Sequence, residues 1–337
     1  TPTGFDVVTE RSRSSADAVV LCHGNQPPAA LAVDGAPLPD APWHVANPWD
    51  LGRLRTLPAD ARVVVVGTGL TAVDTVITLL EEGPGRHVTM VSRQGLLPKP
   101  HIEQQHTAWV TKVPDEATTA DAIADAVRRE CATAAERGVS WRNVVDGLRP
   151  LTQALWLRLP LDERRRFLAV HAREWEIRRH RMAPDVALRL QRYRFEGRLS
   201  IRTGTLHEVT DRVDACSVRL APDQAALDVD AIVNCTGPLA DIRRSQDPLV
   251  RALLARGLLA PDPLALGVDA TVDGRVIGAD RNVVDGLHVV GPATKGTLWE
   301  STAIPEIRAQ AAQVAAAVHR DLAVTPVANC EIRRRGR

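Results

Sequence analysis

The chain has 337 residues, of which 45% are hydrophobic and 25% are charged, and its formal net charge is +1. This length allows two domains with cores of their own, and the composition is that of a folded globular protein. The small net charge gives no general attraction to nucleic acid or to an anionic membrane. No apolar run approaches the roughly 20 residues of a transmembrane helix, and no secretory signal opens the sequence. We therefore expect no nucleic-acid partner, no membrane partner and a cytoplasmic location.

The cysteines lie far apart in the sequence, and no two of them form a C-x-x-C pair. This spacing predicts neither a metal site nor a redox-active disulfide. Cysteine is also a small apolar residue that packs well in cores. We therefore expect the cysteines to fill core space rather than to carry electrons.

The first residues of the chain are predicted to belong to the middle of a fold rather than to its start. The sequence begins at Thr1, and residues 5–10 and 18–22 have the composition of short strands, the second of them buried. A polar, proline-rich connector then runs from Ala29 to about Asp60. We expect part of the N-terminal region of this fold to lie outside the chain.

One βαβ unit is predicted next. The four-valine run Arg62–Val66 is apolar almost throughout, as in parallel strands that are buried on both faces. A glycine-rich turn, Gly67–Ala72, leads into a helix that has apolar residues at helical spacing up to about Glu82. The next strand is predicted at Val88–Val91.

The turn has the pattern G-x-G-x-x-A, which is typical of dinucleotide-binding folds when a strand precedes it and a helix follows. Gly67 makes the tight turn, Gly69 lets the backbone approach a pyrophosphate, and Ala72 is small enough where the helix meets the strand. The helix N-terminus offers N–H groups and its positive dipole end to the phosphates. A tight turn without a ligand is the alternative. The predicted cofactor contacts here are Gly67, Thr68, Gly69, Leu70 and Thr71.

The end of the second strand indicates which nicotinamide cofactor is used. NAD sites usually place Asp or Glu there to bind the ribose 2′-hydroxyl, but this chain has Ser92 and Arg93. A guanidinium suits a 2′-phosphate, because arginine makes bidentate charged contacts. NADP is therefore favoured, with NAD as the other possibility. An Arg93 that only points into water is the alternative.

Residues 101–197 differ from the rest of the chain, since helical periodicity dominates and arginines are dense. We predict a helical insertion there. A terminal helix is expected from about Ser301 to His319, and residues 323–337 are predicted to be a disordered tail. The strands predicted in the second half of the chain are 199–201, 206–209, 217–220, 231–235 and 287–290.

Several long stretches resemble a known family. They are GTGLTAVDTVITLL, VSRQGLLPKPH, WRNVVDGLRPLTQALW, RRRFLAVHAREWEIRRHRMAP and NCTGPLADIRRSQDPLVRALLARGL. In these stretches the chain resembles FAD/NAD(P)-binding proteins grouped with bacterial YdhS-like flavoproteins, distant relatives of ornithine and lysine N-hydroxylases and of flavin-containing monooxygenases. The resemblance covers about Val19 to Val318. Family members begin with an FAD-binding G-x-G-x-x-G segment that has no counterpart here, so the rest of the FAD domain could lie on a separate chain.

The resemblance implies three segments that close around FAD, at 19–24, 234–238 and 286–292. A helix starting near Ser301 and Thr302 would direct its positive end at the flavin N1–O2 edge, which stabilises a reduced, anionic flavin. For each segment the alternative is a buried strand that ends in a glycine turn. The FAD contacts expected on this basis are Gly24, Asn25, Gly237, Pro238, Gly291, Pro292, Ser301 and Thr302.

Four residues are candidates for substrate contacts. Arg178 and His180 belong to a basic cluster in the insertion, which suits either an anionic ligand or a solvated helix face. His101 is part of the family pattern, although such a histidine is more often a hydrogen-bonded structural residue. Trp299 is expected beside the flavin ring. No catalytic residue is named, because the cofactors carry the difficult step and the protein supplies position and electrostatics.

The predicted fold class is α/β, a flavoprotein with two dinucleotide-binding domains, Rossmann-like parallel sheets and a helical insertion. The function predicted is an FAD-dependent oxidoreductase that takes hydride from NADPH and hydroxylates a small organic molecule. The alternatives are an NAD(P)H:acceptor reductase without oxygen insertion, and a non-catalytic nucleotide-binding or partner subunit. The predicted segments are an FAD-domain portion at 1–57, a nicotinamide-nucleotide domain at 58–100 and 198–238, the insertion at 101–197, a second FAD-domain portion at 239–322 and the tail at 323–337.

Overall fold

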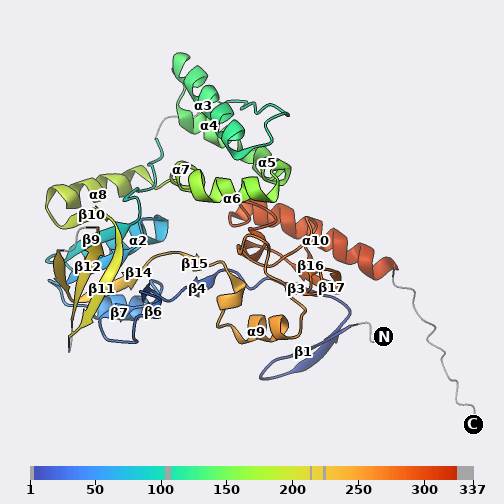
Figure 1. The fold of residues 1–337 in the computed structure, drawn as a ribbon, viewed down its shortest axis with the longest axis horizontal. Coiled ribbons are helices and arrows are strands. Elements are labelled where there is room, and N and C mark those ends of the chain that lie inside the picture. Colours follow the sequence, from blue (N-terminus) through green and yellow to red (C-terminus); the bar gives the residue numbers. More distant parts are fainter. Residues whose placement is uncertain (1–3, 103–107, 213–214, 223–224, 325–337) are drawn as a thin grey trace, which may run out of the picture. The chain divides into compact units, whose positions relative to one another are not determined.

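The computed structural model describes residues 4–102, 108–212, 215–222 and 225–324, which form two compact units (Figure 1). Each unit has its own hydrophobic core. Unit 1 consists of the described parts of Thr1–Gln26, Thr152–Leu161 and Ala240–Arg337, and unit 2 of those of Pro27–Leu151 and Asp162–Leu239.

Unit 2 is built on a five-stranded sheet with the order β10-β9-β8-β14-β7, and every neighbouring pair in it is parallel. A three-stranded antiparallel sheet, β11-β12-β13, accompanies it. The strands of these two sheets are β7 (His44–Val45), β8 (Arg62–Val66), β9 (His87–Ser92), β10 (Leu199–Thr203), β11 (Thr205–Asp211), β12 (Cys216–Ala221), β13 (Ala226–Val229) and β14 (Ala231–Asn234). The shorter strands are β4 (Gln26–Pro28), β5 (Ala32–Val33), β6 (Ala36–Pro37) and β15 (Pro238–Leu239).

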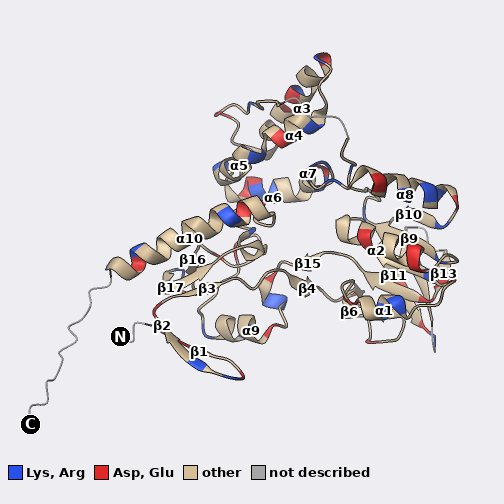
Figure 2. Cartoon of the chain, turned by 180° about the vertical axis from the view of Figure 1, so that it is seen from behind, with Lys and Arg blue, Asp and Glu red and all other residues tan. Residues whose placement is uncertain are grey.

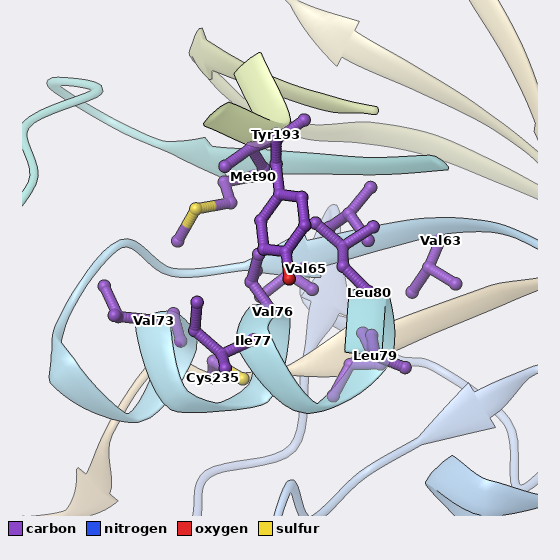
Figure 3. Packing of buried hydrophobic residues seen from close by; sticks show 14 of the residues in the cluster. Val63, Val65, Val73, Val76, Ile77, Leu79, Leu80, Met90, Tyr193 and Cys235 are labelled. Carbon is purple, nitrogen blue, oxygen red and sulfur yellow. The ribbon is translucent and has the colours of Figure 1, made fainter. Parts of the chain in front are cut away.

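The five-stranded sheet is covered on both faces, which is why β8 is apolar almost throughout. Val63 and Val65 pack against helix α2 (Leu70–Glu82) in the first core of the unit (Figure 3). Val64 points the other way, into a second core shared with β12 and β13. Because successive strand residues face opposite sides, this alternation confirms the prediction of a strand that is buried on both faces.

Helices of unit 2 carry the rest of the first core. Tyr193 from α8 is 2% exposed and packs with Met90 of β9 (Figure 3). The outer side of α8 is charged, with Arg189 bound to both Glu81 and Asp185 at 2.7 Å (Figure 2). The helices of unit 2 besides α2 are α1 (Leu51–Arg55), α3 (Ala120–Glu136), α4 (Trp141–Gly147), the 3-10 turn η1 (Arg149–Leu151), α6 (Leu161–Val170), α7 (Ala172–Arg179) and α8 (Pro184–Phe195).

Unit 1 contains a three-stranded sheet with the order β16-β17-β3, in which β17 and β3 are parallel. Helix α10 packs on β17 through Asp321, which lies 2.6 Å from Arg275 and 3.2 Å from the buried His288. The elements of unit 1 are β1 (Phe5–Val8), β2 (Arg13–Ala16), β3 (Val19–Leu21), α5 (Thr152–Arg158), η2 (Ile242–Arg244), α9 (Pro248–Ala255), β16 (Arg275–Ile277), β17 (Val283–Val289), η3 (Pro292–Thr294) and α10 (Ile304–Val324).

The structure divides the chain differently from the predicted segments. The stretch Pro27–Leu151 belongs to unit 2, and His44–Val45 extends its parallel sheet, whereas residues 1–57 are predicted as one FAD-domain portion. Thr152–Leu161 belongs to unit 1, although it lies within the predicted insertion. His44 and Val45 pair with β14, and Trp156 is buried in a stack on Trp299. Contacts of this kind leave no periodic signal in the sequence.

Two predictions about single elements need correction. Strand β3 is only partly buried, since its central residue Val20 is 40% exposed. Helix α10 begins at Ile304 rather than at 301–302, and it continues to Val324. Residues 323–324 of the predicted tail are therefore helical, and residues 325–337 lie outside the described residues. Among the helices that the structure describes, none combines the length and the hydropathy that a membrane span requires.

The buried cysteines give a test of the packing. Burial raises the pKa of the Cys216 thiol to about 12 and that of Cys235 to about 11. At pH 8 the thiolate fraction of Cys235 is then about one in a thousand, and thiolate is the form that reacts. Cys22 is exposed. We expect iodoacetamide at pH 8 to alkylate Cys22 in the native protein and to spare Cys216 and Cys235 until the protein is unfolded, as read by peptide mass spectrometry. Rapid native labelling of Cys235 would contradict this packing.

Candidate functional site

The glycine-rich turn connects β8 to α2 and lies against the end of β14. Gly67 has φ +122°, and a Cβ on it would come within 2.1 Å of the Cys235 carbonyl oxygen. The Cys235 amide in turn donates to the Val66 carbonyl at 2.8 Å. Only glycine allows the two backbones to approach this closely. Gly67 is therefore required both for the backbone conformation of the turn and for its packing against Cys235.

Gly69 lies where a phosphate would be bound. It is the N-cap of α2, it makes no side-chain cap hydrogen bond, and a Cβ on it would have nothing within 4 Å. The first amide with an acceptor in the helix is that of Val73, which donates to the Gly69 carbonyl at 3.0 Å. The amides of Leu70 and Thr71 thus have no partner inside the helix, and the space beside Gly69 is open, an arrangement that suits a pyrophosphate.

Thr68 and Ser92 join the turn to the end of β9. Thr68 is 2% exposed, and its hydroxyl lies 2.9 Å from the Ser92 hydroxyl and 2.7 Å from the Leu96 carbonyl oxygen. The Ser92 hydroxyl also accepts from the Gly95 amide at 3.1 Å. Because a hydroxyl has one proton, Thr68 donates to Leu96 and Ser92 donates to Thr68. Both hydroxyls, predicted as cofactor contacts, are therefore committed to the protein's own network.

Two arginines lie at this end of the sheet. Arg93 is exposed at the end of β9. Arg173 reaches the same place from α7, and its Nη2 donates to the Thr68 hydroxyl at 2.9 Å and to the Leu96 carbonyl. Arg173 was not among the predicted residues, because 105 positions separate it from Thr68 and no sequence signal joins them.

The predicted segment at 234–238 lies beside the turn. Asn234 is fully buried, donates through Nδ2 to the Ala29 carbonyl at 2.8 Å and accepts from the Thr236 hydroxyl at 2.7 Å. Gly237 follows with φ +93° and open space around a Cβ, and Pro238 begins β15. The amide of Asn234 thus holds the loop after β14 and leaves Gly237 facing outward from the packed chain.

In unit 1, β3 and β17 are parallel, and their last residues, Leu21 and Val289, are paired. The two strands therefore end at the same edge of the sheet. The turns that follow hold Gly24 at φ +68° and Gly291 at φ +92°, and a Cβ on either would have nothing within 4 Å. Asn25, next to Gly24, is exposed. Both glycines therefore combine a left-handed backbone with open space, as expected where a ligand approaches the backbone closely.

The buried polar atoms of unit 1 that lack a hydrogen-bond partner among the described residues include Arg275 Nε, His288 Nδ1, His23 Nε2 and Ser301 Oγ. The last two lie next to or at predicted FAD contacts. Ser301 is 1% exposed, whereas its neighbour Thr302 is exposed. Buried polar atoms are nearly always paired, so these two atoms call for a polar ligand or water. They fit a cofactor that carries many polar atoms, as FAD does.

Gln310 of α10 fixes the turn after β17, and it is not among the residues predicted from sequence. It is 3% exposed, accepts from the Gly291 amide at 2.9 Å and donates to the Thr294 hydroxyl at 2.8 Å. Pro292 begins the short η3 turn between these two contacts. The same alanine-rich helix carries a second glutamine, the exposed Gln313, so the residue type alone does not single out Gln310.

Trp299 is buried in unit 1 and stacks on Trp156 of α5 at a ring-centroid distance of 4.8 Å. The Trp156 indole donates to the Gly296 carbonyl at 2.9 Å, and the Lys295 ammonium lies 4.9 Å from the Trp299 ring centroid. Trp156 is not among the residues predicted for the site. Its contact with residues 140 positions away could not be read from spacing.

The other substrate candidates lie in unit 2. Arg178 forms an ion pair with Glu174 and lies 5.7 Å from the Trp141 ring centroid. His180 is exposed at the C-terminal end of α7, and His101 is exposed, with its amide donating to the Met182 carbonyl at 2.9 Å. These contacts give Arg178 a structural role in the insertion, and a substrate role for the three residues stays a prediction.

Comparison with known proteins starts with sequence. No family model matches the chain. Uncharacterized proteins of Mycobacterium bovis and Mycobacterium tuberculosis are 25% identical to it over 293 residues, which is 80% of this chain and 53% of theirs. The chain thus spans about half the length of the curated relatives that it matches.

Solved structures are similar over nearly the whole chain. L-lysine 6-monooxygenase from Pseudomonas syringae has a TM-score of 0.59 at 20% identity, over 95% of this chain and 67% of that one. The reduced ornithine hydroxylase from Pseudomonas aeruginosa has a TM-score of 0.59 at 16% identity, over 92% and 64%. A Kutzneria ornithine N-hydroxylase with reduced FAD, NADP+ and L-ornithine has a TM-score of 0.55 at 17% identity, over 94% and 67%. These similarities confirm the predicted fold class, that of two-dinucleotide-binding flavoproteins.

Proposed function

We propose that the chain belongs to an FAD-dependent oxidoreductase that takes hydride from NADPH and hydroxylates a small organic molecule. The observation that carries this proposal is the turn at Gly67–Thr71, where the first amides of α2 have no partner within the helix and the space beside Gly69 is open. The YdhS-like resemblance and the similarity in fold to flavin-dependent N-hydroxylases support the same assignment.

In unit 2 the amides of Leu70 and Thr71 would bind the pyrophosphate of NADPH, and Arg93 its 2′-phosphate. The positive end of α2 adds a favourable interaction with the phosphate charge. Ser92 and Thr68 have their hydroxyls committed to each other and to Leu96, so they hold the end of β9 in place. An acidic side chain, which an NAD site places at this strand end, is replaced by Arg93.

In unit 1 the turns at Gly24 and Gly291 would hold FAD, and the buried atoms His23 Nε2 and Ser301 Oγ would bind its polar groups. FAD supplies the hydride acceptor and the centre that reduces dioxygen. Trp299, stacked on Trp156, would present a rigid apolar wall that excludes water. The chain itself contributes binding, orientation and exclusion of water, as proteins do in cofactor chemistry.

Hydroxylation balances as one NADPH, one proton, one dioxygen and one substrate giving NADP+, water and a product that holds one oxygen atom. The chain contains no C-x-x-C pair that could accept the electrons instead. The similar solved structures act on lysine and ornithine, and a primary amine is therefore the first substrate class to examine.

We expect the FAD-loaded protein to oxidise NADPH faster when the right member of a panel of primary amines is present. With isotopically labelled dioxygen, one labelled atom should appear in the product by mass spectrometry. Turnover that continues without oxygen on an artificial acceptor, with no label in any product, would favour the reductase instead. Failure to bind FAD at all would favour the non-catalytic subunit.

A further inference from the structure

Arg173 brings a second positive charge from the insertion to the end of β9. Its hydrogen bonds within the described residues all go through Nη2, to the Thr68 hydroxyl at 2.9 Å and to the carbonyls of Leu96 and Thr68. Nη1 lies 3.9 Å from a Glu176 carboxylate oxygen, which is beyond hydrogen-bond distance. A guanidinium has five donors, so this fixed side chain has donors to spare.

The surroundings of Arg173 favour a bound anion. Its side chain is 28% exposed, so it is half-buried yet open to a ligand. Burial lowers the pKa of Arg173 below its usual value, the Glu176 carboxylate opposes this, and the charge of Arg93 lowers it further. The charge of Arg93 thus acts on Arg173, and an anion bound by both guanidinium groups would relieve this repulsion.

Arg93 and Arg173 lie where a dinucleotide-binding fold places the 2′ position of the cofactor ribose. In dinucleotide-binding folds the ribose 2′ position lies at the end of the second strand, which is Ser92 here. Thr68, which Arg173 contacts, lies 2.9 Å from Ser92 between their hydroxyl oxygens. Since both hydroxyls are engaged with the protein, the arginines are the donors left for a phosphate at this position.

We propose that Arg173 joins Arg93 in binding the 2′-phosphate of NADPH, so that the helical insertion takes part in choosing NADPH over NADH. This inference rests on the proposed function and adds to it a specificity-determining residue. The contact of Arg173 with Thr68 and Leu96 holds its guanidinium in place before the cofactor arrives, which limits the entropy lost on binding.

The test is calorimetric titration of the protein and of Arg173→Met with adenosine 2′,5′-bisphosphate, NADPH and NADH. Loss of one charged bidentate contact should weaken the two 2′-phosphorylated ligands by about 10- to 100-fold. NADH affinity should change by less than about 3-fold, because NADH has no 2′-phosphate. Arg173→Gln, which keeps a donor for the Leu96 carbonyl, should show the same selective loss and guards against a folding defect.

Arg165→Met is the matched control, since Arg165 is an exposed arginine of α6 in the same insertion, and it should leave all three affinities unchanged. Equal weakening of NADPH and NADH in Arg173→Met and Arg173→Gln, or no weakening, overturns the inference while the proposed function stands. Wild-type protein that binds none of the three ligands overturns the proposed function and the inference with it.

Discussion

Replacing Gly69 with glutamate should weaken NADPH binding by at least about 100-fold while leaving the fold intact. The new side chain would project into the open space before α2, where the unpaired amides of Leu70 and Thr71 meet the phosphates. It would fill the space and add a negative charge beside a pyrophosphate, and like charges at contact distance repel strongly. Gly69 has φ −80°, which any residue adopts, so the free energy of unfolding should change by no more than about 0.5 kcal/mol.

Equilibrium titration with NADPH, together with urea unfolding, measures both parts of this expectation. Leu188→Glu serves as the control, because Leu188 is 65% exposed on α8 and its replacement adds the same charge elsewhere in unit 2. Unchanged NADPH affinity in Gly69→Glu would mean that the nucleotide does not bind at this turn, and the oxidoreductase proposal would lose its main support.

The Gly67→Ala variant should lose stability rather than binding alone. A Cβ at this position would lie 2.1 Å from the Cys235 carbonyl oxygen, and the residue has φ +122°, which L-residues rarely adopt. Either β14 or the turn must shift, and both are tied to the buried sheet. We expect unit 2 to be destabilised by about 3 kcal/mol or more, in line with other substitutions that combine overpacking with backbone strain.

Hydrogen exchange of the β8 and β14 amides in urea reports the stability of unit 2 by itself. Gly138→Ala is the control, since Gly138 has φ +70° but nothing within 4 Å of a Cβ, so it isolates the cost of the backbone conformation at about 1 kcal/mol. If Gly67→Ala costs no more than Gly138→Ala, the close approach to Cys235 does not constrain the turn.

The βαβ unit could be predicted because all of its information is local. A buried strand, a turn pattern and a helix follow one another within Arg62–Ser92, and each has its own period or residue signature. The predicted helix and the observed α2 share the same end at Glu82. The observed β9 runs from His87 to Ser92, one residue longer at each end than the prediction.

The parts that were missed depend on contacts between distant residues. Arg173 meets Thr68 across 105 positions, and Trp156 meets Gly296 across 140. The strand β7 has only His44 and Val45, too short for a periodic pattern, and it is recognisable only by its pairing with β14. Side chains of this kind are placed by tertiary packing, and a single sequence carries no record of their partners.

The start of α10 is another feature that could not be predicted from local sequence. Ser301 and Thr302 have the residue types of an N-cap, and this favours a helix that begins there. The structure instead buries Ser301 and starts the helix at Ile304. Glu300 has φ +65°, a turn conformation that separates it from the helix. The residue types of a helix start thus lie two to three positions before the helix itself.

Anaerobic mixing of the FAD-loaded protein with NADPH tests the proposed hydride transfer most directly. We predict that the visible absorbance of the flavin falls as NADPH is oxidised in equal amount, and that the Gly69→Glu variant, loaded with the same FAD, shows no such fall at the same NADPH concentration. Flavin that stays oxidised in the wild-type protein while NADPH is bound would contradict the proposal that these two cofactors react on this protein.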